Sequence, residues 1–179
     1  MTGVSPRLAA LRQAFDDGFA APVRPEPRDV EHLLAARIAG TAYALRGRET
    51  AGLIGDRTVT GLLGPLPELV GITAARGALV PVYSLATLLG HPRESNDRWL
   101  ALGRGATPIA LAFETFEGFV SVHPAQIVAI SELDGGHRHA PEVVHEGATL
   151  RFVISLSSLL HAIEQRIGAP VSRKGSESE

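Results

Sequence analysis

Short apolar runs separated by turn residues fill the centre of the chain. The first two runs, 33–38 and 41–45, lie on either side of Ala39-Gly40, a pattern that predicts a β-hairpin with a tight turn. Further strands are expected at 50–54, 57–60, 69–74, 78–84, 97–103, 108–114, 118–122 and 126–131. Many short strands at regular spacing predict an all-β barrel or sandwich, mostly antiparallel.

An internal repeat sharpens this expectation. The segment 82–89 matches 153–160, 71 residues further on, and in both an apolar strand runs into the pattern Ser-Leu-x-x-Leu-Leu. The repeat predicts two similar small β units, each closed by the same strand-to-helix step. A last helix is expected at about 157–167, ended by Gly168 and Pro170.

The two ends of the chain differ from its centre. In residues 1–32, Leu8, Leu11, Phe15 and Phe19 recur at helical spacing, and a proline-rich linker follows. This helix either packs on its own domain or docks on a partner. Residues 171–179 carry nothing to bury, so a disordered tail is expected after a main domain at 33–170.

The composition argues against several classes of function. The formal net charge of −2 and the few aromatic residues (1 Trp, 2 Tyr, 6 Phe) argue against nucleic-acid binding. The lack of cysteine excludes disulfides and thiolate metal sites. No secretory signal or membrane-spanning run is recognisable, so we expect a cytoplasmic protein without direct membrane insertion.

The search for catalytic chemistry yields one weak candidate. His137, His139 and His145 lie close to Glu142 and Glu146, which allows a small metal-binding or hydrolytic β protein as an alternative. A solvated loop is the simpler interpretation of such a short histidine-rich tract. No nucleophile–base pair or phosphate-binding loop is found, no cofactor is expected, and the chain is interpreted as a non-enzymatic binding module.

The stretch 69–85 resembles the signature of the CheW-like family of chemotaxis adaptors. The residues that carry the resemblance are Gly71, Arg76, Gly77, Pro81, Val82 and Leu85, followed by Leu88-Leu89-Gly90. Upstream, Tyr43-Ala44-Leu45 falls at the family's Tyr-Ala-Leu spacing, and the similarity extends over about residues 33–165.

The resemblance implies a fold, a function and a set of contact residues. The fold would be two intertwined five-stranded, SH3-like β-barrels with short helices, including a C-terminal helix, and a groove between the barrels. The function would be that of a non-catalytic adaptor that couples the regulatory domain of a CheA-type histidine kinase to chemoreceptor cytoplasmic tips, in a membrane-associated or cytosolic array. The expected partner-binding residues are Leu69, Val70, Gly71, Arg76, Gly77, Thr50, Leu53, Arg98 and Trp99.

Some positions depart from the family pattern. The family often has an acidic residue after Tyr-Ala-Leu that pairs with the arginine, but Gly52 stands there and Glu49 is the nearest acid. The remaining departures replace apolar residues of the pattern, at Gly47, Thr50, Arg98 and Trp99. These departures motivate an alternative, a diverged adaptor that binds the kinase or another partner and receives a non-receptor input through its N-terminal helix.

Overall fold

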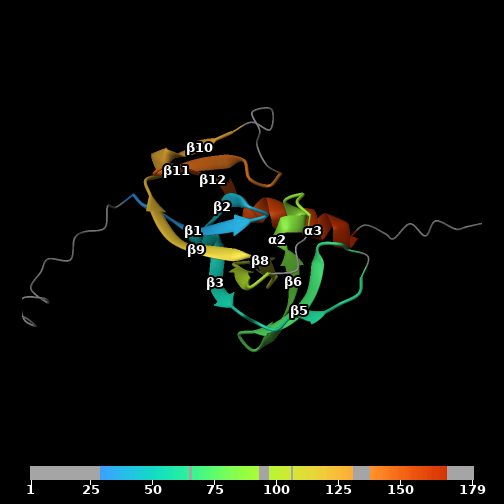
Figure 1. The fold of residues 1–179 in the computed structure, drawn as a ribbon. Coiled ribbons are helices and arrows are strands. Elements are labelled where there is room, and N and C mark those ends of the chain that lie inside the picture. The colour runs from blue at the N-terminus through green and yellow to red at the C-terminus, as the bar shows by residue number, and fades with distance from the viewer. Residues whose placement is uncertain (1–28, 65, 93–96, 106, 131–137, 169–179) are drawn as a thin grey trace, which may run out of the picture.

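A computed structural model describes residues 29–64, 66–92, 97–105, 107–130 and 138–168 of the chain. Within them the chain forms two β-sheets that meet at two helices, α2 (Leu85–Leu88) and α3 (Leu156–Gly168) (Figure 1). The helix expected from Leu8, Leu11, Phe15 and Phe19, and the tail expected at 171–179, lie outside the described residues.

Each sheet has six strands. Sheet A, in the order β10-β11-β12-β2-β1-β9, contains β1 (Glu31–Ile38), β2 (Thr41–Arg46), β9 (Thr115–Val122), β10 (Ile127–Ala129), β11 (Glu142–Glu146) and β12 (Thr149–Ile154). Sheet B, in the order β3-β7-β8-β6-β5-β4, contains β3 (Thr50–Gly55), β4 (Thr60–Gly61), β5 (Leu69–Ala75), β6 (Ala78–Ser84), β7 (Trp99–Gly103) and β8 (Ala110–Phe113). The remaining elements are the 3₁₀ turns η1 (Gly47–Glu49) and η2 (Pro124–Gln126).

The all-β fold with short helices is confirmed, whereas the closed five-stranded barrels are corrected to open six-stranded sheets. The chain makes β1 and β2, builds the whole of sheet B, and returns to complete sheet A, so the two units are intertwined as expected. Neither sheet closes, because the strands at the ends of each order do not pair with each other. β4 and β10 are also too short to supply a continuous ladder for closure.

The sequence repeat corresponds to a repeated structural device. β6 pairs in parallel with β8 and leads into α2, and β12 pairs in parallel with β2 and leads into α3. The matching serines act alike: Ser84 Oγ accepts a hydrogen bond from the Thr87 N–H, and Ser155 Oγ accepts one from the Ser158 N–H, each at 3.3 Å. Both contacts are N-caps, which satisfy backbone donors that a helix start leaves free.

Apolar side chains gather in three clusters. The central core lies where the two sheets and the two helices meet, and includes Tyr43, Leu45, Leu85, Leu111, Phe113, Leu156 and Leu159. A second cluster fills the interior of sheet B and includes Val80, Val82, Leu100, Leu102 and Ala112. A third fills the interior of sheet A and includes Leu33, Ala44, Val122, Val144 and Val153. Each sheet therefore curls around a small core of its own.

Two buried arginines close the interior of sheet A at its opposite ends. Arg46 pairs with Glu31, at 2.6 Å, and with Glu142. Arg151 pairs with Glu146, at 2.6 Å, and with Glu117. The arginine side chains are only 10% and 9% exposed. Because these arginines alternate with apolar residues along β2 and β12, they lie on the same face as the core of sheet A.

Candidate functional site

A groove lies on sheet A beside the start of β3. It has a volume of about 650 Å³ and is lined by Asp29, Val30, Glu31, His32, Gly47, Arg48, Thr50, Phe119 and Pro124. Sheet A supplies one wall through β1 and β9, η1 supplies Gly47 and Arg48, and Thr50 is the only lining residue from a strand of sheet B. The groove therefore lies mainly on sheet A, where the chain passes into sheet B.

An aromatic strip, made of Trp99, Phe116 and Phe119, connects the groove with the central core. The Trp99 and Phe116 rings are 5.2 Å apart, the Phe116 and Phe119 rings are 5.1 Å apart, and Phe119 is 72% exposed. Residues three apart on a regular strand face opposite sides, but β9 has a register shift beside Gly118, whose φ is +138°. This bulge places Phe116 and Phe119 on the same side.

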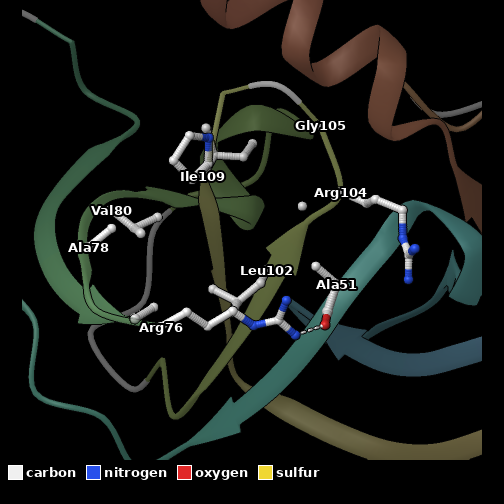
Figure 2. A pocket seen from close by; sticks show the side chains of 11 residues that line it. Ala51, Arg76, Ala78, Val80, Leu102, Arg104, Gly105 and Ile109 are labelled. Carbon is white, nitrogen blue, oxygen red and sulfur yellow. Dashed lines mark hydrogen bonds between the residues drawn. The ribbon is translucent and has the colours of Figure 1, made fainter.

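A second hollow, here called the sheet B hollow, lies at one end of sheet B (Figure 2). Its volume is about 440 Å³, and it is lined by Ala51, Ala75, Arg76, Ala78, Val80, Leu102, Gly103, Arg104, Gly105, Pro108 and Ile109. The lining is apolar except for the two arginines, so the sheet B hollow suits a ligand with an apolar body and negative charge.

Arg76 stands at the turn between β5 and β6. The backbone angles φ of Arg76 and Gly77 are +50° and +78°, and a glycine adopts such a turn without the steric cost of a side chain. The Nη2 of Arg76 donates a hydrogen bond to the Ala51 carbonyl on β3, the other edge of the curled sheet. Arg76 thus braces the open end of sheet B, as Figure 2 shows.

Position 52 lies beside this arginine in space, as the family spacing implies. A Cβ atom on Gly52 would lie 3.3 Å from Arg76 Nη2. Because Gly52 carries no acid, the Ala51 carbonyl accepts the hydrogen bond of the arginine. Glu49 has a different role, since its carboxylate accepts a hydrogen bond from the Leu156 N–H at 3.1 Å, at the start of α3.

Several of the expected partner-binding residues lie near the groove and the aromatic strip. Thr50 lines the groove, and Leu53 and Trp99 are half-buried against the central core. Arg98 is exposed and forms two hydrogen bonds to Asp56, at 3.0 and 3.3 Å. This ion pair engages the guanidinium within the chain.

The other expected residues lie on β5 and its turn, apart from the groove. Leu69 packs against the central core, and Val70 lines a third hollow of about 290 Å³. Gly71 is covered by β4, because a Cβ atom there would lie 2.0 Å from the Thr60 carbonyl oxygen. Val70 lines this hollow together with Arg98, so the two sets of expected residues meet there.

The histidine candidates do not assemble where they are described. His139 Nδ1 lies 2.8 Å from Ser158 Oγ, and His145 is exposed on β11, whereas His137 lies outside the described residues. Burial, with the positive charges of Arg138 and Arg166, lowers the pKa of His139 below its ordinary value. In the described part of the chain, no group of three or more His, Cys, Asp or Glu side chains is placed to hold a metal ion.

Sequence reasoning missed two features of these sites. Phe116 and Phe119 meet only because of the bulge, which no residue pattern indicated. Arg104 was not among the expected site residues, but its side chain donates to the Thr50 carbonyl, with Nε at 3.4 Å and Nη2 at 3.3 Å. Its backbone N–H also donates to the Glu49 carbonyl at 2.7 Å, and Arg104 is one of the residues that line the sheet B hollow.

No helix within the described residues is long and apolar enough to cross a membrane.

The two intertwined six-stranded sheets and the short helices define an all-β domain. The family model of the CheW-like domain matches residues 32–164, so the chain belongs to the CheW-like domain family, whose members are scaffolds.

A solved structure supports the same fold. The crystal structure of the scaffolding protein TtCheW from Thermoanaerobacter tengcongensis matches with a TM-score of 0.63 and 16% sequence identity. The match covers 72% of this chain and 91% of that chain, so the fold is shared over nearly the whole of TtCheW. Among curated proteins, no sequence matches this chain.

Proposed function

We propose that the chain is a cytoplasmic adaptor that couples the regulatory domain of a CheA-type histidine kinase to the cytoplasmic tips of chemoreceptors. Membership of the CheW-like family supports the adaptor role. The observation that carries the proposal is the groove beside β1, β9 and η1, with Phe119 exposed in its wall. The adaptor works by binding and catalyses no reaction.

The groove suits the receptor side of this function. The exposed Phe119 ring packs on the Phe116 ring, which packs in turn on Trp99, and aromatic anchors of this kind supply much of the binding energy of interfaces. Receptor tips are helical, and an amphipathic helix binds by laying its apolar face in a groove. Glu31 and Arg48 of the groove pair with each other at 3.0 Å, and Glu31 also pairs with Arg46 at 2.6 Å, so the apolar ring is expected to contribute most to helix binding.

We assign the surface that binds the kinase regulatory domain to sheet B. The contact residues expected there are Leu69, Val70, Gly71, Arg76 and Gly77. The turn at Arg76 and Gly77 is exposed, and its geometry is fixed by the brace to Ala51. In contrast, the covered Gly71 acts by positioning β4 at the edge of sheet B.

Titration calorimetry with the full chain tests the proposal. The kinase regulatory domain and a receptor-tip fragment are titrated separately, with wild type, Phe119→Ser and the control Val128→Ser, which alters an exposed residue of β10 outside the groove. We expect Phe119→Ser to weaken tip binding about tenfold or more and to leave kinase binding unchanged. Folded protein that binds neither partner at tens of micromolar would contradict the proposal.

A second candidate is a diverged adaptor whose input arrives through residues 1–28. The observation that favours it is that Asp29 and Val30 line the groove, so the preceding segment joins the described domain at the groove itself. Deleting residues 1–28 would then abolish binding of one partner and spare the kinase. A deletion that changes neither binding event excludes this version.

A further inference from the structure

The sheet B hollow differs in charge from the other hollows of the described structure. The groove contains Asp29 and Glu31, and the hollow beside Val70 contains Asp97. The described lining of the sheet B hollow contains Arg76 and Arg104 and no acidic side chain. An electropositive hollow in a chain whose net charge is −2 attracts negatively charged ligands.

Both arginines are held in place without a carboxylate partner. Arg76 donates to the Ala51 carbonyl and Arg104 to the Thr50 carbonyl, and the two guanidinium groups lie on the two sides of Ala51 (Figure 2). Among the described residues, no salt bridge engages either arginine. Each guanidinium carries more N–H donors than these contacts use, so donors remain for a carboxylate.

Apart from the two arginines, the hollow is lined by apolar and small residues. Val80, Leu102 and Ile109 are buried residues of the lining, and Ala51, Ala75 and Ala78 contribute small side chains to it. A volume of about 440 Å³ exceeds the ~300 Å³ at which small-ligand sites begin. One large apolar side chain can therefore enter while charged groups beside it stay at the rim.

We propose that the sheet B hollow is a docking site for an acidic peptide segment of a partner protein. An apolar side chain of the segment enters the hollow, and carboxylates on either side of it pair with Arg76 and Arg104. The choice of a peptide as occupant rests on the proposed adaptor function. The hollow and the groove share no lining residue, although Thr50 of the groove is adjacent to Ala51 and accepts the hydrogen bonds of Arg104.

Gly52 is the residue that keeps this site available. Its missing side chain leaves the space beside Arg76 Nη2 without an acid, so the charge of the arginine is open to a partner's carboxylate. The substitution Gly52→Glu would introduce a carboxylate that competes for Arg76 from within the chain. The contact that this new side chain must displace is the mobile end of an arginine, which moves more readily than backbone.

An NMR titration of the ¹⁵N-labelled full chain tests the site directly. The probe is acetyl-Glu-Phe-Glu-amide, and acetyl-Gln-Phe-Gln-amide is its uncharged match. We expect the acidic probe to perturb the amide signals of Ala51, Ala78 and Gly105, and added salt to weaken its binding. The uncharged probe should bind about tenfold more weakly, because charge-assisted hydrogen bonds are lost.

Single-residue variants test whether Arg76 and Arg104 bind the acidic probe. Arg76→Gln and Arg104→Gln should each weaken binding of the acidic probe about tenfold. Arg57→Gln is the control, because Arg57 is also exposed and donates to a backbone carbonyl, that of Ala74 at 3.2 Å, but lines the hollow beside Val70. Gly52→Glu should weaken the probe without removing either arginine, while the exposed-site control Thr58→Glu should not.

Four results would overturn the proposal. These are equal binding of the two probes, equal perturbation by inorganic phosphate, perturbations confined to other parts of the sheet, and the same perturbations on concentrating the chain alone, which would indicate a second copy as occupant. If the acidic probe fails while the kinase regulatory domain still binds, only this site is excluded. If both fail, the proposed adaptor function fails as well.

Discussion

Sheet A and sheet B are built alike but end differently. Each has six strands, one parallel pairing, and a strand that runs into a serine-capped helix. The ends of sheet A are closed by Arg46 and Arg151, which pair with acids of the same sheet. At the corresponding open end of sheet B, Arg76 and Arg104 contact only backbone carbonyls among the described interactions.

This difference indicates that the ion pairs of sheet A contribute to stability, whereas the arginines of sheet B are available for binding a partner. Charged groups that find partners inside the chain fix the curl of sheet A and leave little charge for a ligand. Arginines held by carbonyls keep their positive charge unneutralised, at a site where a partner can meet it. In an adaptor, the ion clusters of sheet A then serve as the frame, and sheet B, with the part of β1 and β9 that lines the groove, serves as the contact surface.

The largest expected effect comes from breaking an ion cluster of sheet A. Arg151→Met removes the ion pair described for Glu146 and leaves Glu117 with Arg37 alone, at a mostly buried site, and should lower the free energy of unfolding by about 3 kcal/mol. The matched change in sheet B, Arg76→Met, removes an exposed brace and should cost about 1 kcal/mol. Urea unfolding of both variants measures this, and equal losses would contradict the division between frame and contact surface.

The next largest effect is expected at Gly71, and it tests whether β4 covers β5 there. Gly71→Ala places a methyl group 2.0 Å from the unshifted Thr60 carbonyl, so β4 must move, and the expected cost is about 2 kcal/mol. Gly61→Ala is the control, because its nearest atom would be the Val70 carbonyl oxygen at 3.9 Å. Thermal unfolding should separate the two variants clearly. Indistinguishable variants would mean that β4 does not cover Gly71, and that β5 is open to partners there.

A smaller effect is expected from the serine N-caps at the two strand-to-helix steps. Ser84→Ala and Ser155→Ala each remove a side-chain acceptor from a helix start and should each cost about 1 kcal/mol. Replacement by glycine should cost only a few tenths of that amount. Chemical unfolding of the four variants checks this. A large loss at one serine and none at the other would show that the repeat is not an equivalent device in the two sheets.

The smallest effect is a pH dependence specific to sheet A. Burial raises the pKa of Glu117, but hydrogen bonds from Arg151 and Arg37 outweigh it and leave the pKa below the ordinary 4.5. The stability that Glu117 contributes is therefore present above about pH 4.5 and is lost as the pH falls through its lowered folded-state value.

Unfolding of wild type and Glu117→Gln at a series of pH values tests this sign. The difference in stability should stay constant from pH 7 down to about 5 and shrink in more acidic solution. Glu164→Gln, on the exposed side of α3, controls for the loss of one carboxylate. A difference that grows on acidification would contradict the role of the cluster.

Local patterns predicted much of the fold. The hairpin around Ala39-Gly40 forms as expected, with both φ values positive, and so does the turn at Arg76-Gly77. The repeat predicted two like units because it encodes a local step from strand to helix. Closure into barrels was wrong, because it depends on the meeting of distant edge strands, such as β9 and β10, and not on any local run of residues.

The candidate site was less predictable for the same reason. Spacing placed position 52 beside Arg76, and the structure places them in contact distance. The aromatic strip depends on a bulge in β9, which arises from pairing with β1 and not from the pattern of β9 alone. The ion cluster at Arg151 joins residues from β9, β11 and β12, and such long-range pairs leave no periodic signal.

In the proposed adaptor, sheet B and the groove carry the partner contacts, while the rest of sheet A serves as the frame. This division can be tested by an NMR titration of the ¹⁵N-labelled chain with the unlabelled kinase regulatory domain, followed by a receptor-tip fragment. We expect amide signals of the β5–β6 turn to change with the kinase and those around Phe119 and Thr50 to change with the tip. Changes confined to β10 and β11, or no change with folded protein and excess partner, would contradict it.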